Sequence, residues 1–313
     1  MKRTAFLFPG QGAQYPGMGK DFYDSFAVAR ETFEEANDLL SFDLSKLIFE
    51  GPEERLVETR YSQVAIFVNS VALLRTLQEQ IPDFQSAVCA GLSLGEYTAL
   101  FASGRLGFED TLRLVRLRGS LLNEACEKTQ GAMSAVLGLT ADQVETIVRA
   151  LQSDVWVANF NCPGQAVISG TLDGIAQAAE ALKKQGAKRI IPLQVHGAFH
   201  CPLMQSAQDQ LALAIACAPI SESSIDFVMN VPGDYVTDIQ KTKDCLIRQV
   251  THSVRWEQGI LAMMKRDVAL YIEIGCGKTL TGLNKKMGMT APTRSLDQIS
   301  DLEEIAKEIA YAI

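Results

Sequence analysis

A short apolar run that ends in a glycine and passes directly into a helix is the feature that most limits the fold of this chain. Residues 87–91, Ala-Val-Cys-Ala-Gly, have the length of one buried strand. A helix is predicted to start directly after it, with residues 95–101. Similar apolar runs at 6–8 and 268–274 also end in glycine-containing loops. Buried strands that alternate with helices form parallel sheets covered on both faces. The pattern therefore predicts an α/β fold with a parallel core sheet.

The segment 130–196 has a different pattern of strands and helices. Strand-like runs lie at 133–139, 155–160, 165–169 and 189–195. Helical segments follow Thr140 and Thr171, two residue types that commonly cap helices, and a turn is predicted at 161–164. The order β-α-β-β-α-β is that of a ferredoxin-like motif. We therefore predict a small ferredoxin-like subdomain at 130–196, inserted into a large α/β domain formed by 1–129 and 197–313.

Composition excludes several classes of protein. The 313 residues are 47% apolar and 21% charged, a globular balance that excludes intrinsic disorder. The chain has 37 acidic and 29 basic residues, and the resulting net charge of −8 argues against a nucleic-acid partner. Seven cysteines without a CxxC pair favour a reducing compartment. The initial apolar run stops at Pro9, and the longest later one, 211–220, is shorter than the roughly 20 residues that span a bilayer. We expect a cytoplasmic protein without a membrane partner.

The pentapeptide Gly-Leu-Ser-Leu-Gly at 91–95 lies between the predicted strand and helix. In a nucleophile elbow of the form GxSxG, the serine occupies a strained turn, and flanking glycines relieve the crowding. Ser93 is therefore a candidate nucleophile. A plain glycine-rich turn between strand and helix remains the alternative.

A serine nucleophile needs a base, and the chain has three histidines: His196, His200 and His252. His200 is the candidate, because it lies in the loop that leaves the predicted subdomain. The spacing of His196 and His200 occurs in some zinc helices, but the nearby Gly197 argues against a helix, and no third ligand is apparent. A surface or core position is the alternative for each histidine, and no metal site is predicted.

Two glycine-rich loops resemble nucleotide motifs without matching them. The loop at 9–12, Pro-Gly-Gln-Gly, is followed by Tyr15 where the dinucleotide motif needs glycine, so we expect it to offer main-chain N–H groups instead. The loop at 275–279 ends in Lys-Thr like a Walker A motif, but Ile272 replaces its first glycine. Nucleotide hydrolysis is therefore disfavoured.

Three arginines follow the pentapeptide on a predicted helix at 108–126. They are Arg113, Arg116 and Arg118. A buried arginine that faced Ser93 would bind a carboxylate in bidentate fashion, whereas solvated arginines on a helix surface would not matter for the site. Helical spacing alone does not choose among the three.

Taken together, these segments resemble the malonyl-CoA:acyl carrier protein transacylases and the related acyltransferase domains of fatty acid and polyketide synthases. The resemblance covers essentially the whole chain and implies that the parallel core sheet is hydrolase-like. The matching segments are FPGQGAQYPGMG, GLSLGEYTAL, RLRG, GAMSAVLGL, ANFNCPGQAVISG, GAFHCPLM, QVTHSVRW and EIGCGKTLTGL, in the order of the family.

The resemblance implies a ping-pong transfer that supplies malonyl units for fatty acid synthesis. Ser93 would attack malonyl-CoA while His200 takes its proton, and the phosphopantetheine thiol of holo acyl carrier protein would then accept the malonyl group. A main-chain carbonyl near Gln249 would orient His200, and the N–H groups of Gln11 and Leu94 would bind the oxyanion. No cofactor is expected, because coenzyme A enters as a thioester substrate and the phosphopantetheine belongs to the partner.

The resemblance also implies which residues bind the substrate. Arg118 would pair with the free malonyl carboxylate, and Phe199 would favour malonyl over methylmalonyl through its bulk. Asn159 and Asn161 match a segment that lines the cleft, although they are also typical turn residues. Because carrier proteins are acidic, docking requires a basic rim, for which Lys285 and Lys286 are the candidates. A solvated helix face is the alternative for this pair.

Two positions depart from the family pattern. Leu92 stands where the family usually has a histidine, which changes the hydrogen bonding around the elbow, and Ser253 stands where it commonly has a proline, which reduces loop rigidity. Two other functions remain open. A serine hydrolase would have the same elbow, but no acidic partner for His200 is apparent. A malonyl-CoA sensor would retain Arg118 without needing both Ser93 and His200.

Overall fold

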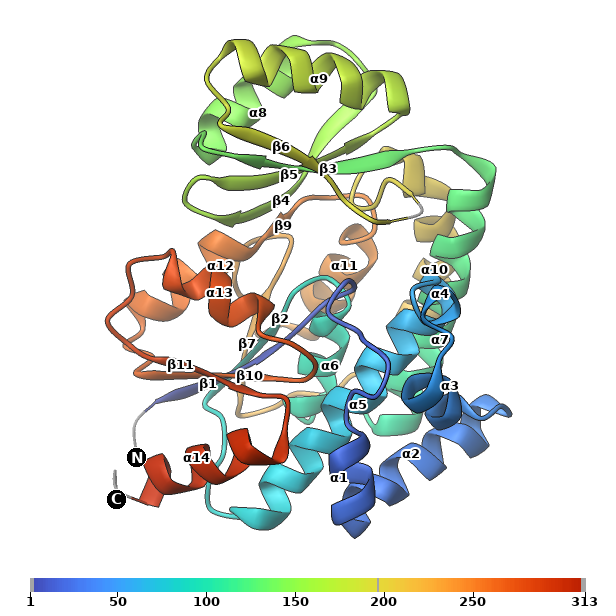
Figure 1. Cartoon of the computed structure of the whole chain (residues 1–313), viewed down its shortest axis with the longest axis vertical. Coiled ribbons are helices and arrows are strands. Elements are labelled where there is room, and N and C mark those ends of the chain that lie inside the picture. The colour runs from blue at the N-terminus through green and yellow to red at the C-terminus, as the bar shows by residue number, and fades with distance from the viewer. Residues whose placement is uncertain (1–2, 196, 311–313) are drawn as a thin grey trace.

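The computed structural model describes residues 3–195 and 197–310, and the strands of these residues form two sheets (Figure 1). The larger sheet has the strand order β11–β10–β1–β2–β7–β8, and its neighbours are parallel except for β7 and β8. Its strands are β1 (Thr4–Phe8), β2 (Val88–Gly91), β7 (Asp226–Met229), β8 (Asp234–Tyr235), β10 (Leu270–Ile274) and β11 (Thr293–Leu296).

Helices cover both faces of the larger sheet. They are α1 (Lys20–Ser25), α2 (Ala27–Leu40), α3 (Leu44–Glu50), α4 (Glu53–Leu56), α5 (Thr59–Gln80), α6 (Gly95–Ala102), α7 (Phe108–Lys128), α10 (Gln205–Cys217), α11 (Ile239–Arg248), α12 (Trp256–Lys265), α13 (Thr279–Lys285) and α14 (Ile299–Ala310). Phe6 and Phe8 of β1 belong to the core that contains α2 and α5, whereas Ala5 and Leu7 pack with α12 and α13. A parallel strand buried on both faces is continuously apolar, which explains the sequence of β1.

The smaller sheet has the strand order β6–β3–β5–β4–β9. Its elements are β3 (Ala132–Leu137), α8 (Ala141–Ala150), β4 (Val155–Cys162), β5 (Gln165–Gly170), α9 (Leu172–Lys184), β6 (Arg189–Pro192) and β9 (Val254–Arg255). Helices α8 and α9 lie on the face turned away from the larger sheet (Figure 1). Strand β9 comes from outside the predicted 130–196 insertion and pairs in parallel with β4, so the rest of the chain also contributes to this sheet.

Local sequence signals explain several boundaries in this region. Thr140 and Gln143 form a capping box at α8, and the Thr171 hydroxyl accepts the N–H of Gly174 at α9, as their residue types predict. The predicted turn at 161–164 is wrong in its first half. Strand β4 continues through Cys162, which pairs with Gln165, so only residues 163–164 remain for the turn. Strand pairing and burial outweigh the turn propensity of an asparagine here.

Phe26 separates α1 from α2, because its backbone is extended with φ −122°. Strand β9 passes directly into α12, which starts at Trp256.

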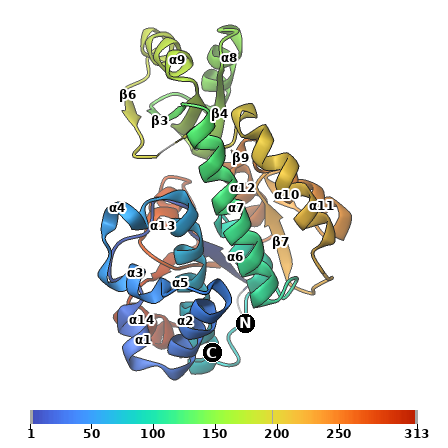
Figure 2. The same ribbon diagram turned by 90° about the vertical axis from the view of Figure 1, so that its right-hand side faces the viewer.

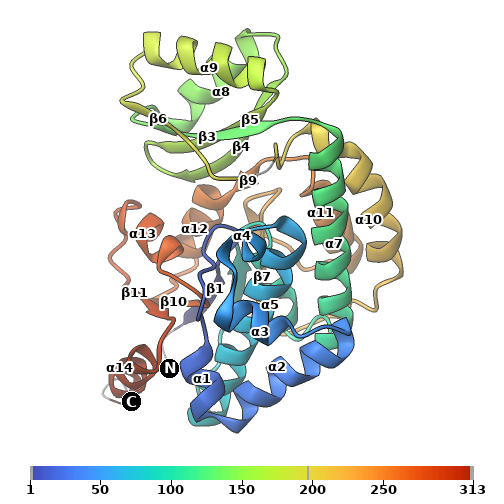
Figure 3. The ribbon, with the colours of Figure 1, turned by 45° about the vertical axis from the view of Figure 1, so that its right-hand side comes forward.

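Helix α7 connects the two sheets. Figure 2 shows it running from the helices around the larger sheet up to the smaller sheet, and Figure 3 shows α7, α10 and α11 side by side. Residues carried by α7 are thereby brought between the two sheets. Among the described helices, none combines the length and the apolar composition needed to cross a bilayer.

Candidate active site

Ser93 lies in a tight turn between β2 and α6. Its φ is +54°, a left-handed conformation that is uncommon for a residue with a side chain. The flanking glycines are sterically required: a Cβ atom on Gly91 would lie 2.0 Å from the main-chain carbon of Gly95, and one on Gly95 would lie 2.1 Å from the oxygen of Phe8. The pentapeptide therefore has the strand–turn–helix context that an elbow needs, and not that of a relaxed glycine-rich turn.

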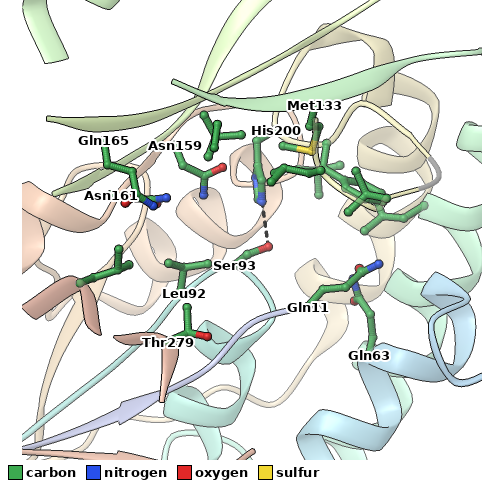
Figure 4. Close-up of a pocket in the computed structure, with 18 of the residues that line it drawn as sticks. Gln11, Gln63, Leu92, Ser93, Met133, Asn159, Asn161, Gln165, His200 and Thr279 are labelled. Carbon is green, nitrogen blue, oxygen red and sulfur yellow. Dashed lines mark hydrogen bonds between the residues drawn. The ribbon is translucent and has the colours of Figure 1, made fainter. Parts of the chain in front are cut away.

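Ser93 and His200 meet across the cleft between the sheets. The Ser93 Oγ lies 2.8 Å from the Nε2 of His200 (Figure 4). The Nδ1 of that ring lies 2.8 Å from the main-chain oxygen of Gln249. Because a carbonyl only accepts hydrogen bonds, Nδ1 carries the hydrogen, and the lone pair of Nε2 faces the serine. Burial, and secondly the charge of Arg118, lower the pKa of His200 to about 4, so the ring is a neutral acceptor at pH 7.

The structure distinguishes the three arginines of α7. Arg113 and Arg116 are exposed, whereas Arg118 is 1% exposed. The Nη2 of Arg118 donates to the Ser93 Oγ at 3.1 Å and to the Gln249 Oε1 at 3.0 Å, and its Nη1 donates to Gln63 at 2.6 Å. Within residues 3–195 and 197–310, no carboxylate forms a salt bridge with this guanidinium. A buried cation without a counter-ion is a binding site for an anion.

A pocket of about 240 Å³ opens beside these groups. Its lining residues are Gln11, Gln63, Leu92, Ser93, Arg118, Leu122, Met133, Ala135, Asn159, Asn161, Gln165, Val167, Leu193, Val195, Phe199, His200, Val250, Thr279 and Leu283. Figure 4 shows Gln11, Gln63 and Met133 on one side of the serine and histidine, and Asn161 and Gln165 on the other. We call these two groups of lining residues, on either side of Ser93, the first and second arms of the pocket.

The predicted substrate residues Asn159, Asn161 and Phe199 all line this pocket. The two asparagines are nine-tenths buried on β4. Among the described residues, no group pairs with the Oδ1 of Asn161. The second arm therefore contains a buried acceptor that needs a donor.

The two predicted oxyanion donors, Gln11 and Leu94, both belong to the surroundings of Ser93. Leu94 follows Ser93 as the N-cap of α6, and Gln11 lies in the loop after β1 and lines the pocket. The side chain of Gln11 donates to the Thr59 Oγ1 at 3.2 Å and accepts from the Gln63 Nε2 at 3.3 Å. These contacts fix the loop that carries the Gln11 N–H group.

Three polar residues of the site were not predicted from the sequence: Gln63, Glu96 and Asn230. The Oδ1 of Asn230 accepts the Ser93 N–H at 2.7 Å, and its Nδ2 donates to the Gly91 oxygen at 2.7 Å. Burial raises the pKa of the Glu96 carboxyl to about 8, while the Asn230 N–H, Arg118 and Gln249 oppose that rise. A signal for Asn230 was present, because a polar residue directly after a buried parallel strand lies at the edge where such sites form.

The glycine loop that resembles a Walker motif has a different role. Glu273 at the end of β10 accepts the N–H groups of Leu280 and Thr281, each at 2.8 Å. A carboxylate of the chain therefore already occupies the N-terminus of α13, where a nucleotide phosphate would bind.

The candidate docking lysines lie at the other end of α13 and are exposed. Lys286 donates to the Oε1 of Gln165 at 2.9 Å, which connects α13 to the smaller sheet at the rim of the pocket. No contact of this kind is recorded for Lys285 within the described residues.

The structure shows what Leu92 and Ser253, the two departures from the family pattern, contact. Leu92 lines the pocket beside Gly10, and the Ser253 hydroxyl donates to the main-chain oxygen of Val157. The Ser253 contact ties the loop to β4, which offsets the expected loss of rigidity. His196, the other member of the rejected zinc pair, lies outside the described residues.

Comparisons with known proteins agree with this geometry. Residues 5–296 match the acyl transferase domain family. The malonyl CoA-acyl carrier protein transacylase of Bacillus subtilis is 42% identical over 310 residues, which are 97% of this chain and 96% of that protein. The Escherichia coli K12 protein of the same name is 39% identical over 302 residues, with 96% and 97% covered.

Solved structures give the same result. The malonyl-transacylase of the complex described as "PlMCAT:AntF (holo)", with a type II polyketide synthase acyl carrier protein, has a TM-score of 0.94 and 36% identity, covering 98% of this chain and 99% of the other. An acyl carrier protein S-malonyltransferase from Vibrio cholerae has a TM-score of 0.92 and 39% identity, with 97% and 99% covered. The predicted α/β class and the predicted resemblance are both confirmed, and the chain therefore belongs to the acyl transferase domain family.

Proposed function

We propose that this chain transfers malonyl groups from malonyl-CoA to the phosphopantetheine thiol of a holo acyl carrier protein, by a ping-pong mechanism through a malonyl-Ser93 ester. The observation that carries the proposal is Arg118, a buried cation without a carboxylate partner in the described residues, 3.1 Å from the Ser93 Oγ. A short diacid bound to Ser93 as an ester has its free carboxylate only two carbons beyond the ester carbonyl. That carboxylate reaches the guanidinium and neutralises it.

In the first half-reaction the Ser93 Oγ attacks the thioester carbonyl, and the Nε2 of His200 takes its proton. The hydrogen bond from Nδ1 to the Gln249 oxygen keeps Nε2 free to accept and stabilises the imidazolium that forms. The N–H groups of Gln11 and Leu94 bind the oxyanion, and each such donor is typically worth about 100- to 1,000-fold in rate. The carbon–sulfur bond then breaks, and the imidazolium protonates the sulfur of coenzyme A.

In the second half-reaction the carrier protein's thiol gives its proton to His200 and attacks the ester. The carbon–oxygen bond to Ser93 breaks, and the Ser93 Oγ takes the proton back. The malonyl group leaves as a thioester, and the enzyme returns to its first state. No bound cofactor is needed, because both thiols arrive with the substrates.

The two arms of the pocket receive the two parts of the substrate. Arg118 and Phe199 hold the malonyl group, and the bulk of Phe199 disfavours an α-methyl group by about 1–3 kcal/mol. Asn159 and Asn161 contact the pantetheine arm, whose amide N–H groups satisfy the unpaired Oδ1 of Asn161. This assignment gives the buried Oδ1 of Asn161 a hydrogen-bond donor in the complex.

The test is mass spectrometry of the protein mixed with malonyl-CoA. We expect a malonyl adduct on the peptide that contains Ser93, and its transfer when holo carrier protein is added. A hydrolase would release malonate at a rate independent of carrier protein, and a sensor would bind malonyl-CoA without forming an adduct. Either of these results would contradict the proposal.

The pH dependence of malonyl loading follows from the environment of His200. Burial and the Arg118 charge disfavour the imidazolium and hold the pKa near 4 rather than 6.5. The base is therefore lost only when the pH falls to about 4. We expect kcat/KM for loading to stay level from pH 7 down to about pH 5 and to fall below that range. An acid limb centred near pH 6.5 would show that the ring is not desolvated in solution.

Docking of an acidic carrier protein requires a basic rim on this acidic chain. We expect the double variant Lys285→Glu/Lys286→Glu to raise the KM for carrier protein roughly 10-fold at low salt, with malonyl loading of Ser93 unchanged. The matched control is Lys183→Glu/Lys184→Glu, at the exposed end of α9 on the far side of the smaller sheet (Figure 1). An unchanged KM in the first variant would remove these lysines from the docking surface.

We infer in addition a hydrolase-like large domain of residues 1–129 and 197–313, and a ferredoxin-like subdomain of residues 130–196. The order β3–α8–β4–β5–α9–β6 and the strand order β6–β3–β5–β4 support the second assignment. A cytoplasmic location fits a chain whose substrates are coenzyme A and carrier-protein thioesters.

A further inference from the structure

Glu96 is a buried carboxyl group that the proposed reaction does not use. It lies in the first turn of α6, three residues after Ser93, and it is 0% exposed. One of its oxygens accepts the main-chain N–H of Asn230 at 2.6 Å, and the other accepts the Nε2 of Gln249 at 2.6 Å. Both oxygens of the carboxyl therefore accept a hydrogen bond from the chain. A buried carboxyl group with a donor on each oxygen is expected to hold its partners firmly.

Each hydrogen-bond partner of Glu96 also contacts a residue of the proposed reaction. Asn230 accepts the N–H of Ser93, and Gln249 donates to the Ser93 main-chain oxygen at 2.8 Å. The main-chain oxygen of Gln249 holds the Nδ1 of His200, and its side-chain oxygen accepts from Arg118. Ser93, His200 and Arg118 are therefore each connected to the Glu96 carboxyl group through one intervening residue.

The orientation of the Gln249 amide depends on this carboxylate. A glutamine amide has a donating end and an accepting end, and either end can occupy a given position. Here the donating end faces two acceptors, the Glu96 carboxylate and the Ser93 carbonyl, while the accepting end faces the Arg118 guanidinium. Without an accepting oxygen at this position, the preference for this orientation weakens. A reversed amide would turn its NH₂ group toward Arg118, and two donors would then oppose each other.

We propose that Glu96 is the positioning residue of this site, which holds Gln249 and Asn230 so that Ser93, His200 and Arg118 keep their reactive arrangement. This inference rests on the proposed malonyl transfer. It predicts that Glu96 acts on the rate of acylation through Gln249, and not only on the stability of the fold.

The first experiment compares Glu96→Gln with wild type in rapid-quench measurements of malonyl-Ser93 formation. We expect acylation about 10- to 100-fold slower, because one hydrogen-bond acceptor of a buried network is replaced by a donor. The matched control is Glu273→Gln. Glu273 is also 0% exposed and also accepts two N–H groups, but it contacts α13 and not the catalytic residues. We expect its acylation rate to remain that of wild type, even where its melting temperature falls.

The second experiment tests the route through Gln249. If Glu96 acts by orienting that side chain, then Glu96→Gln added to Gln249→Ala should slow acylation little beyond Gln249→Ala alone. The hydrogen on the Nδ1 of His200 should also shift its NMR signal in Glu96→Gln, because the Gln249 carbonyl moves. Fold changes that multiply in the double variant would overturn the inference, as would wild-type acylation by Glu96→Gln.

If Glu96→Gln does not fold, the variant Glu96→Asp tests the inference instead. Glu96→Asp keeps the carboxyl group but shortens the side chain by one methylene, so it cannot reach both donors, and we expect slower acylation here too. Wild-type acylation by Glu96→Asp would overturn the inference. Failure of the underlying function is distinguishable, because in that case the wild-type protein itself would form no malonyl-Ser93.

Discussion

The His200→Ala variant is expected to acylate Ser93 from malonyl-CoA about 100- to 10,000-fold more slowly than the wild-type protein. The serine hydroxyl is a weak nucleophile until a base takes its proton, and the imidazole Nε2 at 2.8 Å is placed to do so. The loss is in the rate of the chemical step. The affinity for malonyl-CoA should change little, because Arg118 remains to bind the carboxylate.

Rapid-quench mass spectrometry of the Ser93 peptide measures this rate directly. The control is His252→Ala, since the His252 side chain is exposed and contacts Thr251 and the Arg248 carbonyl instead of the nucleophile. The control should load at the wild-type rate. Equal loading by the wild type and His200→Ala would mean that another group deprotonates Ser93, and the mechanism proposed above would be wrong.

Features that depend on residues close together in the sequence could be predicted from the sequence alone. The GxSxG turn follows from steric limits within five residues, since Gly91 and Gly95 have no room for a Cβ atom. The caps of α8 and α9 follow from single threonines. The resemblance to a known family added the pairing of Ser93 with His200, which lie 107 positions apart.

Features that depend on the tertiary arrangement could not be predicted from the sequence. Helical spacing could not choose among the arginines of α7, because the choice depends on which face the other helices bury. Glu96 and Asn230 lie 134 positions apart, and their contact exists only because β7 pairs beside β2. Asn161 was assigned to a turn for the opposite reason: its local propensity was correct, but pairing between β4 and β5 overrode it.

The choice of acyl group should reverse in Arg118→Ala. We expect malonyl loading to fall about 100- to 1,000-fold, because the carboxylate loses the buried guanidinium that lies beside Ser93. Acetyl loading should rise, because acetyl-CoA no longer leaves a dry guanidinium unpaired beside its methyl group. The measured quantity is the ratio of the two kcat/KM values, obtained from Ser93 adducts formed with each thioester.

The ratio separates two roles that Arg118 could have. The guanidinium also donates to the Ser93 Oγ and to Gln249, so its removal disturbs the nucleophile for every substrate. A disturbance of this kind slows malonyl and acetyl loading by the same factor and leaves their ratio unchanged, whereas loss of a carboxylate partner changes the ratio. Arg116→Ala, an exposed arginine two positions away on α7, is the control and should change neither rate. A constant ratio in Arg118→Ala would therefore assign this residue to the orientation of Ser93 alone, and the preference for a diacid would need another cause.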